Sequence, residues 1–346
     1  MTDQLGLFDE GAPTSATPEV GALGVDPGMD AVAARLPAAL RLGTSSWSFP
    51  GWAGIVYDRA ASERDLAREG LAAYARHPLL RTVGLDRTYY RSVDSAVYAR
   101  YAEQVPDDFR FLVKADRLVT SPHPPEDGTQ RGPNPNFPDP TFAFNQIVEP
   151  VVEGLGDKAG PILFQFSPIP PNLVGGPRAF LHRLHEFLAS LPQGPLYAVE
   201  LRTPEFLTVD YGAILEETRV AHCYVVHPSM PSIPAQRSVL SAVDHPALVV
   251  RWMLHSGMKY DAARDRYAPF DRLVDEDPAS RAAIVQAVFD TLIMERPAFV
   301  VVNNKAEGSS PLSVMRLAEA IAGDAAENEG GGRPPERATP EPPDQR

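Results

Sequence analysis

Residues 162–202 read ILFQFSPIPPNLVGGPRAFLHRLHEFLASLPQGPLYAVELR, and this stretch decides the fold class. It opens and closes on short apolar runs of strand type, Ile162–Gln165 and Leu196–Glu200. Between them, large apolar residues recur at the spacing of an amphipathic helix: Phe180, Leu181, Leu184, Phe187, Leu188 and Leu191. A strand, a helix and a second strand in this order are typical of two parallel strands joined by a crossover helix.

The same alternation of strand-type runs and helical patterns continues over residues 39–323. A later helical stripe follows Asp277-Pro278, a pair that supplies an N-cap and a first-turn proline. The complete series of strand-type runs is Leu40–Ser45, Thr82–Leu85, Phe109–Lys114, Ile162–Gln165, Leu196–Glu200, Ala221–Val225, Leu248–His255 and Phe299–Val302. Eight strands separated by helices predict a single (β/α)8 barrel of the TIM type, and an open doubly wound sheet is the alternative.

Two end segments and one internal segment lack this alternation. Residues 1–38 and 324–346 are rich in small residues, glycine and proline, so we predict that both are disordered tails. Residues 121–140 contain seven prolines and follow the third predicted strand. A long loop at this place would overhang the C-terminal mouth of a barrel, so we predict a lid there, with an inert linker as the alternative.

Composition and charge limit the classes of protein and partner. Of the 346 residues, 44% are hydrophobic and 22% are charged, as in a soluble globular protein. No apolar run is long enough for a transmembrane helix, and the N-terminus lacks the pattern of a signal peptide. The single cysteine, Cys223, can form neither an internal disulfide nor a thiolate metal site. We therefore expect a cytoplasmic protein with no membrane contact.

The formal net charge of −13 argues against non-specific DNA binding through many phosphate contacts. Three further signatures are missing from the sequence: HExxH, GxGxxG and the Walker lysine loop. We therefore expect no metal site, no dinucleotide or P-loop site, and no cofactor.

Polar side chains stand where the predicted strands run into their following loops. In a parallel barrel these ends meet at one mouth, where ligands bind. The set comprises Ser45, Trp47, Asp86, Lys114, Gln165, Glu200, Arg202, His255, Asn303 and Asn304. It predicts a site that binds or transforms a small polar or anionic molecule, sugar-like or nucleotide-like. The alternative is that each strand simply becomes polar where it leaves the core.

Strand parity places Arg251 and His255 on one face of the seventh strand. A guanidinium inside the barrel must be paired, and Glu200 is the predicted partner. We assign Glu200 as acid or base, His255 as its proton partner, and Lys114 and Arg251 as groups that stabilise an anion. An ion pair between Arg251 and Glu200 that is purely architectural is the alternative, and Lys114 could instead be a surface lysine.

With these residues in view, the chain resembles the YecE-like family, also called domain of unknown function 72. The motifs that carry the resemblance are GTSSWSFPGW (43–52), TYYR (88–91), FRFLVKA (109–115), LGDKAGPILFQF (155–166), YAVELR (197–202), VVRWMLHSG (249–257) and VVNNKAEG (301–308). The resemblance implies a TIM-type barrel and supplies no activity. The sequence departs from the family pattern at Gly84, Ser121, Thr203 and Lys305, which indicates a divergent member.

A second class of function comes from Gln4, Leu5, Leu7 and Phe8, within the pentapeptide QLGLF. This segment resembles the motif by which proteins bind the bacterial sliding clamp. Large apolar residues in an otherwise polar tail are typical of short binding segments. The alternative to an enzyme is therefore a non-enzymatic barrel recruited to DNA replication or repair through this clamp.

Overall fold

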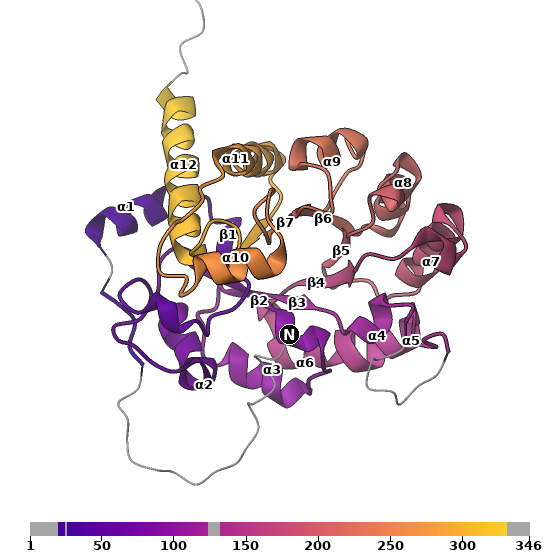
Figure 1. The fold of residues 1–346 in the computed structure, drawn as a ribbon, viewed down its shortest axis with the longest axis horizontal. Coiled ribbons are helices and arrows are strands. Elements are labelled where there is room, and N and C mark those ends of the chain that lie inside the picture. Colours follow the sequence, from indigo (N-terminus) through magenta and orange to yellow (C-terminus); the bar gives the residue numbers. More distant parts are fainter. Residues whose placement is uncertain (1–19, 25, 124–131, 331–346) are drawn as a thin grey trace, which may run out of the picture.

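Eight parallel strands close into a barrel in sequence order, from β1 to β8 and back to β1, in the computed structural model (Figure 1). This confirms the predicted fold class and excludes the open sheet. The structure describes residues 20–24, 26–123 and 132–330. The strands are β1 (Leu40–Thr44), β2 (Leu80–Leu85), β3 (Arg110–Lys114), β4 (Ala159–Phe166), β5 (Tyr197–Leu201), β6 (Ala221–Val226), β7 (Leu248–Trp252) and β8 (Ala298–Val302).

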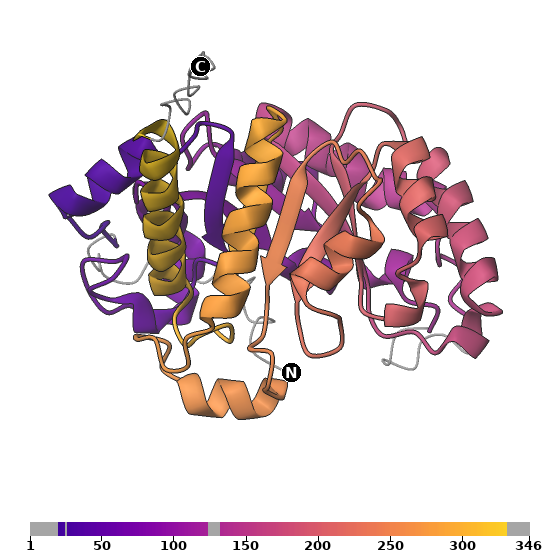
Figure 2. The same ribbon diagram turned by 90° about the horizontal axis from the view of Figure 1, so that it is seen from above.

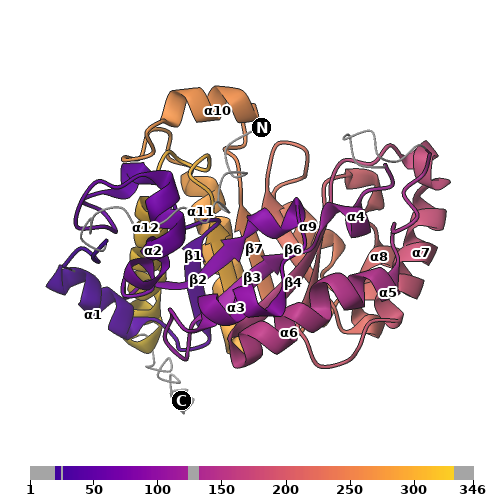
Figure 3. The ribbon, with the colours of Figure 1, turned by 90° about the horizontal axis from the view of Figure 1, so that it is seen from below.

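Helices surround the strands as an outer ring, and α10 lies across the end of the barrel at which β7 ends (Figures 2 and 3). The α-helices are α1 (Pro27–Arg35), α2 (Glu63–Tyr74), α3 (Ser95–Ala102), α4 (Arg117–Thr120), α5 (Pro140–Ala143), α6 (Glu149–Leu155), α7 (Pro177–Ala189), α8 (Val209–Thr218), α9 (Ile233–Val239), α10 (Tyr260–Tyr267), α11 (Pro278–Ile293) and α12 (Ser310–Gly330). Short turns of other helix types are η1 (Pro50–Trp52), η2 (Asp86–Tyr89), η3 (Phe144–Val148), η4 (Gly156–Lys158), η5 (Pro171–Val174) and η6 (Pro204–Phe206).

The helices form where their apolar stripes and caps predict them. The stripe of α7 is buried against the strands, with the Phe164 and Phe187 rings 5.0 Å apart. The side chain of Asp277 accepts a hydrogen bond from the Ser280 backbone N–H at 3.0 Å and caps α11 as expected. Within the described part of the chain, no helix is both long and apolar enough to cross a membrane.

The inside of the barrel changes from apolar to polar toward its C-terminal end. A buried apolar cluster comprises Leu112, Leu163, Ala198, Ala221, Cys223, Val249 and Val301. Side chains two positions further along a strand point to the same side of the sheet. Two positions beyond Leu112, Leu163, Ala198 and Val249, these side chains are Lys114, Gln165, Glu200 and Arg251. On β3, β4, β5 and β7 the next layer toward the mouth is therefore charged and polar, and it carries the candidate site.

Part of each predicted tail is helical. α1 packs against α12, and Val32 on α1 is buried, so the prediction of a tail is wrong for residues 27–35. α12 continues past residue 323 to Gly330, so the predicted C-terminal boundary also falls inside a helix. Gln4, Leu5, Leu7 and Phe8 lie outside the described residues.

The second half of the proline-rich segment 121–140 is fastened to the barrel. The Asn134 side-chain amide donates to the Leu118 and Ser121 carbonyls at 2.6 and 2.7 Å. The Phe137 ring packs edge-on against Phe166 at 6.2 Å between ring centroids. Residues 134–137 therefore pack against the barrel, and the role of the segment as a lid stays a prediction.

Candidate functional site

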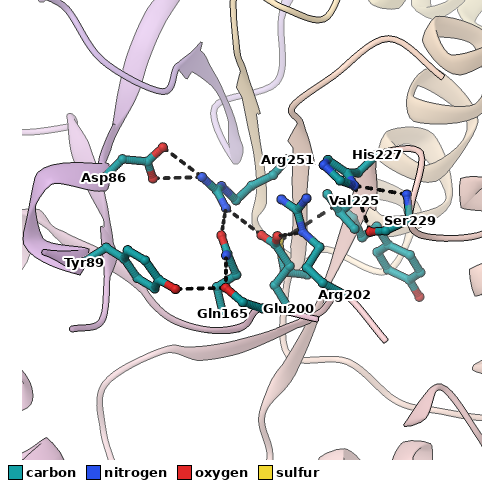
Figure 4. Close-up of polar contacts among 12 residues, drawn as sticks. Asp86, Tyr89, Gln165, Glu200, Arg202, Val225, His227, Ser229 and Arg251 are labelled. Atoms are coloured by element: carbon teal, nitrogen blue, oxygen red, sulfur yellow. Dashed lines mark hydrogen bonds and ion pairs between the residues drawn. The ribbon is translucent and has the colours of Figure 1, made fainter. Parts of the chain in front are cut away.

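Arg251 is the centre of a buried polar network at the mouth of the barrel (Figure 4). Its side chain is 1% exposed. One terminal nitrogen donates to Gln165 Oε1 at 2.9 Å and to Glu200 Oε2 at 2.7 Å. The other donates to both carboxylate oxygens of Asp86, at 2.8 and 3.0 Å. The predicted pairing of Arg251 with Glu200 is therefore confirmed.

Glu200 is completely buried between two guanidinium groups. Arg202 Nε donates to its Oε1, Arg251 donates to its Oε2, and the Cys223 thiol lies 3.8 Å from Oε2. Burial would raise the pKa of Glu200, but Arg202 and Arg251 outweigh that effect and hold the pKa at about 2. A carboxylate this acidic is a poor base at neutral pH. The geometry therefore favours a counter-ion role for Glu200 over the acid–base role that we assigned from the sequence.

Lys114 ends β3 with its amine at the mouth, which excludes the alternative of a surface lysine. The residue is 8% exposed, and its Nζ lies 3.6 Å from the ring centroid of Tyr89. Among the described residues, none accepts a hydrogen bond from this amine. Burial lowers the pKa of Lys114 to about 8, with Asp86 opposing the shift and Arg251 adding to it. Lys114 is therefore the group of the site best suited to proton transfer near neutral pH.

Tyr89, which the sequence analysis did not assign to the site, forms one side of it. Its hydroxyl lies 2.9 Å from Ser167 Oγ, and Ser167 Oγ also accepts from the Gln165 side-chain amide at 3.4 Å. Tyr89 ends η2, directly after the second strand. Its place in the TYYR motif immediately after a strand end is the signal that could have identified it.

The charges of the network do not balance. We call the group formed by Asp86, Lys114, Gln165, Glu200, Arg202 and Arg251 the Arg251 network. It holds three basic side chains against two carboxylates, and the Asp86 side chain is 27% exposed. Apart from its bond to Glu200, the Arg202 guanidinium has no hydrogen-bond partner among residues 20–24, 26–123 and 132–330. Unbalanced positive charge in a buried site favours an anionic ligand.

The family of the chain follows from a match to a family model, whose description is "Protein of unknown function DUF72" and which covers residues 41–339. The chain belongs to the DUF72 family. This agrees with the resemblance seen in the sequence motifs. A search of curated proteins finds none that matches.

Two crystal structures of DUF72 family proteins share this fold. The protein from Enterococcus faecalis has 18% sequence identity and a TM-score of 0.55, over 82% of this chain and 95% of that chain. The protein from Thermotoga maritima has 19% identity and a TM-score of 0.53, over 82% of this chain and 98% of that chain. At these identities the likeness concerns the fold, and the low values agree with a divergent member.

The four departures from the DUF72 pattern make their contacts outside the Arg251 network. These positions are Gly84, Ser121, Thr203 and Lys305. Thr203 Oγ1 accepts a hydrogen bond from the Ile169 backbone N–H at 2.9 Å, and Lys305 Nζ lies 4.4 Å from the ring centroid of Tyr260. In the described part of the chain, none of the four bonds to a member of the network. The departures therefore leave the network intact.

The placement of His255 on the seventh strand is wrong. β7 ends at Trp252, and His255 lies in the following loop, where its backbone N–H donates to the Lys305 carbonyl at 2.9 Å. Its Nδ1 accepts from the Gly257 backbone N–H at 3.4 Å. Among the described residues, no contact joins His255 to Glu200. His255 therefore does not share a face of β7 with Arg251, and its role as the proton partner of Glu200 stays a prediction.

His227 is the histidine that lies near the arginines (Figure 4). Burial, and after it Arg202, lowers the pKa of His227 to about 4, so the ring is neutral at physiological pH. Its Nδ1 accepts from the Ser229 backbone N–H at 3.1 Å. No group of three His, Cys, Asp or Glu side chains within the described residues could hold a metal ion.

Trp47 and Asn304 make hydrogen bonds within the protein, and their predicted role in ligand binding stays a prediction. The Trp47 indole donates to the Leu66 carbonyl at 3.0 Å and is buried. Asn304 Oδ1 accepts from the Trp52 indole at 3.2 Å and from the Ser310 backbone N–H at 2.8 Å. These residues fix the loops around the mouth and hold the start of α12.

Ser45 and Asn303 contact each other at the ends of neighbouring strands. Asn303 Nδ2 donates to Ser45 Oγ at 2.8 Å. Ser45 is buried and Asn303 is half-buried. Their predicted role in ligand binding stays a prediction.

Replacing Lys114 with methionine is expected to stabilise the protein. The pKa of Lys114 falls from 10.5 to about 8 on folding, because burial disfavours the charged amine. Between these two pH values the unfolded chain binds more protons than the folded one, so the free energy of unfolding rises as pH increases from about 8 to 10.5. The shift corresponds to about 3 kcal/mol, so Lys114→Met should raise the free energy of unfolding at pH 7 by up to about this amount. Chemical denaturation at pH 7 and at higher pH measures it.

Lys158→Met is the matched control for this substitution. Lys158 Nζ donates to the Ala102 and Val105 carbonyls at 2.8 and 2.7 Å, so its loss should lower stability. A similar loss for Lys114→Met would show that the Lys114 amine has a protein partner.

Proposed function

We propose that this DUF72 barrel binds a small anionic molecule at its C-terminal mouth and acts on it by acid–base chemistry. Lys114 and Arg202 contact the anion, and Lys114 transfers the proton. The observation that carries the proposal is the unbalanced positive charge of the Arg251 network, together with donors on Lys114 and Arg202 that no described residue satisfies.

The two donor groups differ in the anion geometry that they favour. A guanidinium presents a planar fork that suits a carboxylate or a phosphate, while an ammonium acts as a compact point charge. The Tyr89 ring beside Lys114 adds a flat aromatic surface, which suits the ring of a sugar-like or nucleotide-like ligand. Because the chain carries a net charge of −13, a small molecule fits the site better than a long polyanion.

The ion pairs of Arg251 with Asp86 and Glu200 hold this site in place. Both terminal nitrogens of Arg251 donate hydrogen bonds within the protein, to Asp86, Gln165 and Glu200. The paired groups therefore fix the position and charge of the site, and they leave Arg202 and Lys114 to meet the ligand.

Arg202→Gln is expected to weaken anion binding by about tenfold or more, a change of about 1.4 kcal/mol. Thermal-shift screening with phosphorylated and carboxylated sugars and with nucleotides identifies a binder, and calorimetry measures its affinity. Binding should weaken as salt is added. Arg68→Gln removes the same charge from an exposed site on α2 and serves as the control.

Lys114→Met should also lose binding while it remains folded, which keeps the test valid where Arg202→Gln unfolds the protein. No binding by any anion of the panel at millimolar concentration would overturn the proposal. Equal weakening by Arg68→Gln would do the same, because it would show a general charge effect.

A further inference from the structure

Lys114 differs in its surroundings from the other lysines of the chain. Of the four lysines, Lys158 bonds to two carbonyls and Lys259 is exposed. Lys305 is buried over the Tyr260 ring. Lys114 alone is both buried over a ring and placed within the field of Arg202 and Arg251. These surroundings suit an amine that acts as a nucleophile as well as one that binds an anion.

We propose that Lys114 forms an imine with a carbonyl compound that also carries a carboxylate or a phosphate. This inference rests on the proposed function, because the anionic group of the ligand is the part that Arg202 binds. The carbonyl carbon then lies at the Lys114 amine, whose Nζ is 3.6 Å from the centroid of the Tyr89 ring.

The amine is suited to this reaction by its burial and by its cationic neighbours. Only a neutral amine has a lone pair to attack a carbonyl carbon, and desolvation beside other cations is a known means of producing one. Burial lowers the pKa of Lys114 to about 8. Asp86 and Glu200 oppose this shift, while Arg251 and Arg202 add to it. A larger fraction of the Lys114 amine than of an exposed lysine is therefore neutral at physiological pH.

The reaction balances without a further reactant. The nitrogen lone pair forms a C–N bond while the carbonyl π electrons move to oxygen. The nitrogen then loses its two protons to that oxygen, which leaves as water, and a C=N bond remains. No atom is oxidised or reduced overall, and one water is released for each imine formed.

Reductive trapping on the full chain tests the proposal. The probes are glyoxylate and pyridoxal 5′-phosphate, each an aldehyde with an anionic group, and pyridoxal, which lacks the phosphate. Borohydride reduces the imine to a stable secondary amine, and peptide mapping by mass spectrometry locates it. We expect trapping at Lys114 to be about tenfold or more faster than at Lys259 or Lys305, because burial lowers the pKa of Lys114 and leaves a larger fraction of its amine neutral.

The pH dependence and the variants supply independent measurements. Trapping at Lys114 should rise with pH and level off above about 8. Lys114→Met should remove the fast adduct, Arg202→Gln should slow it for the anionic probes only, and Lys305→Met should leave it unchanged.

Three outcomes would overturn the inference. Trapping at Lys114 no faster than at Lys259 and Lys305, with anion binding retained, would remove the imine and leave the anion site standing. Equal trapping by pyridoxal and its phosphate would show a reactive amine without recognition of an anion. If the parent protein shows neither trapping at Lys114 nor anion binding, both the imine and the proposed function are wrong.

Discussion

Arg251→Ala is expected to lower the free energy of unfolding by about 3–5 kcal/mol, as for other buried ion pairs that lose one partner. The substitution removes the hydrogen bonds to Asp86, Gln165 and Glu200 at once. It leaves the fully buried Glu200 carboxylate with one guanidinium in place of two, and it opens a space inside the barrel.

Urea denaturation at pH 7 measures this effect, with Arg264→Ala as the control. Arg264 on α10 also makes two ion pairs, with Asp261 and Asp265, but its side chain is 46% exposed. Exposed pairs contribute about 0–1 kcal/mol, so the control should change stability little. Similar small effects of both substitutions would show that Arg251 is not the buried centre of the network.

Glu200→Gln is the second substitution with a large expected effect, about 3 kcal/mol of lost stability at pH 7. The pKa of Glu200 is held at about 2 in the folded protein, against 4.5 as its ordinary value. The ionised carboxylate therefore contributes stability that is fully present above pH 4.5 and is lost as pH falls toward 2. In Glu200→Gln, Arg202 and Arg251 face each other across a neutral amide.

Denaturation measured between pH 7 and pH 3 separates this role from a catalytic one. Glu200→Gln should be less stable than the parent at pH 7, and the difference should shrink in acid. Glu319→Gln, which removes an exposed carboxylate paired with Arg316, should show neither effect. Unchanged stability of Glu200→Gln together with lost activity would instead restore the acid–base role assigned from the sequence.

The order of elements and the charged layer of the barrel were predictable from the sequence. Strand-type runs alternating with helical stripes predict parallel strands with helices outside, because each pattern has its own period. The closed barrel and the open sheet both satisfy this pattern, and the pairing of β1 with β8 decides for the barrel. Strand parity also placed Arg251 inside the barrel, and a buried guanidinium requires a carboxylate partner, which Glu200 supplies.

One missed element had a local signal. Asp26-Pro27 begins α1 with the side chain of Asp26 accepting from the Gly28 backbone N–H at 3.1 Å. The same pair of residue types, Asp277-Pro278, predicts the start of α11, and the structure confirms it. The small-residue composition around residue 27 concealed a capped helix, whose stability comes from packing against α12.

The alternation of strands with helices and the pairing of Arg251 with Glu200 follow from the amino-acid sequence, because periodicity and the cost of a buried charge are properties of the chain. The closure of the barrel and the role of each polar residue depend on contacts between segments that are distant in the chain. β7 ends at Trp252, and His255 turns instead to the loop after β8, because its backbone N–H bonds to the Lys305 carbonyl. Glu200 remains an anion and the Lys114 amine approaches neutrality because each pKa depends on burial and on charges carried by distant strands.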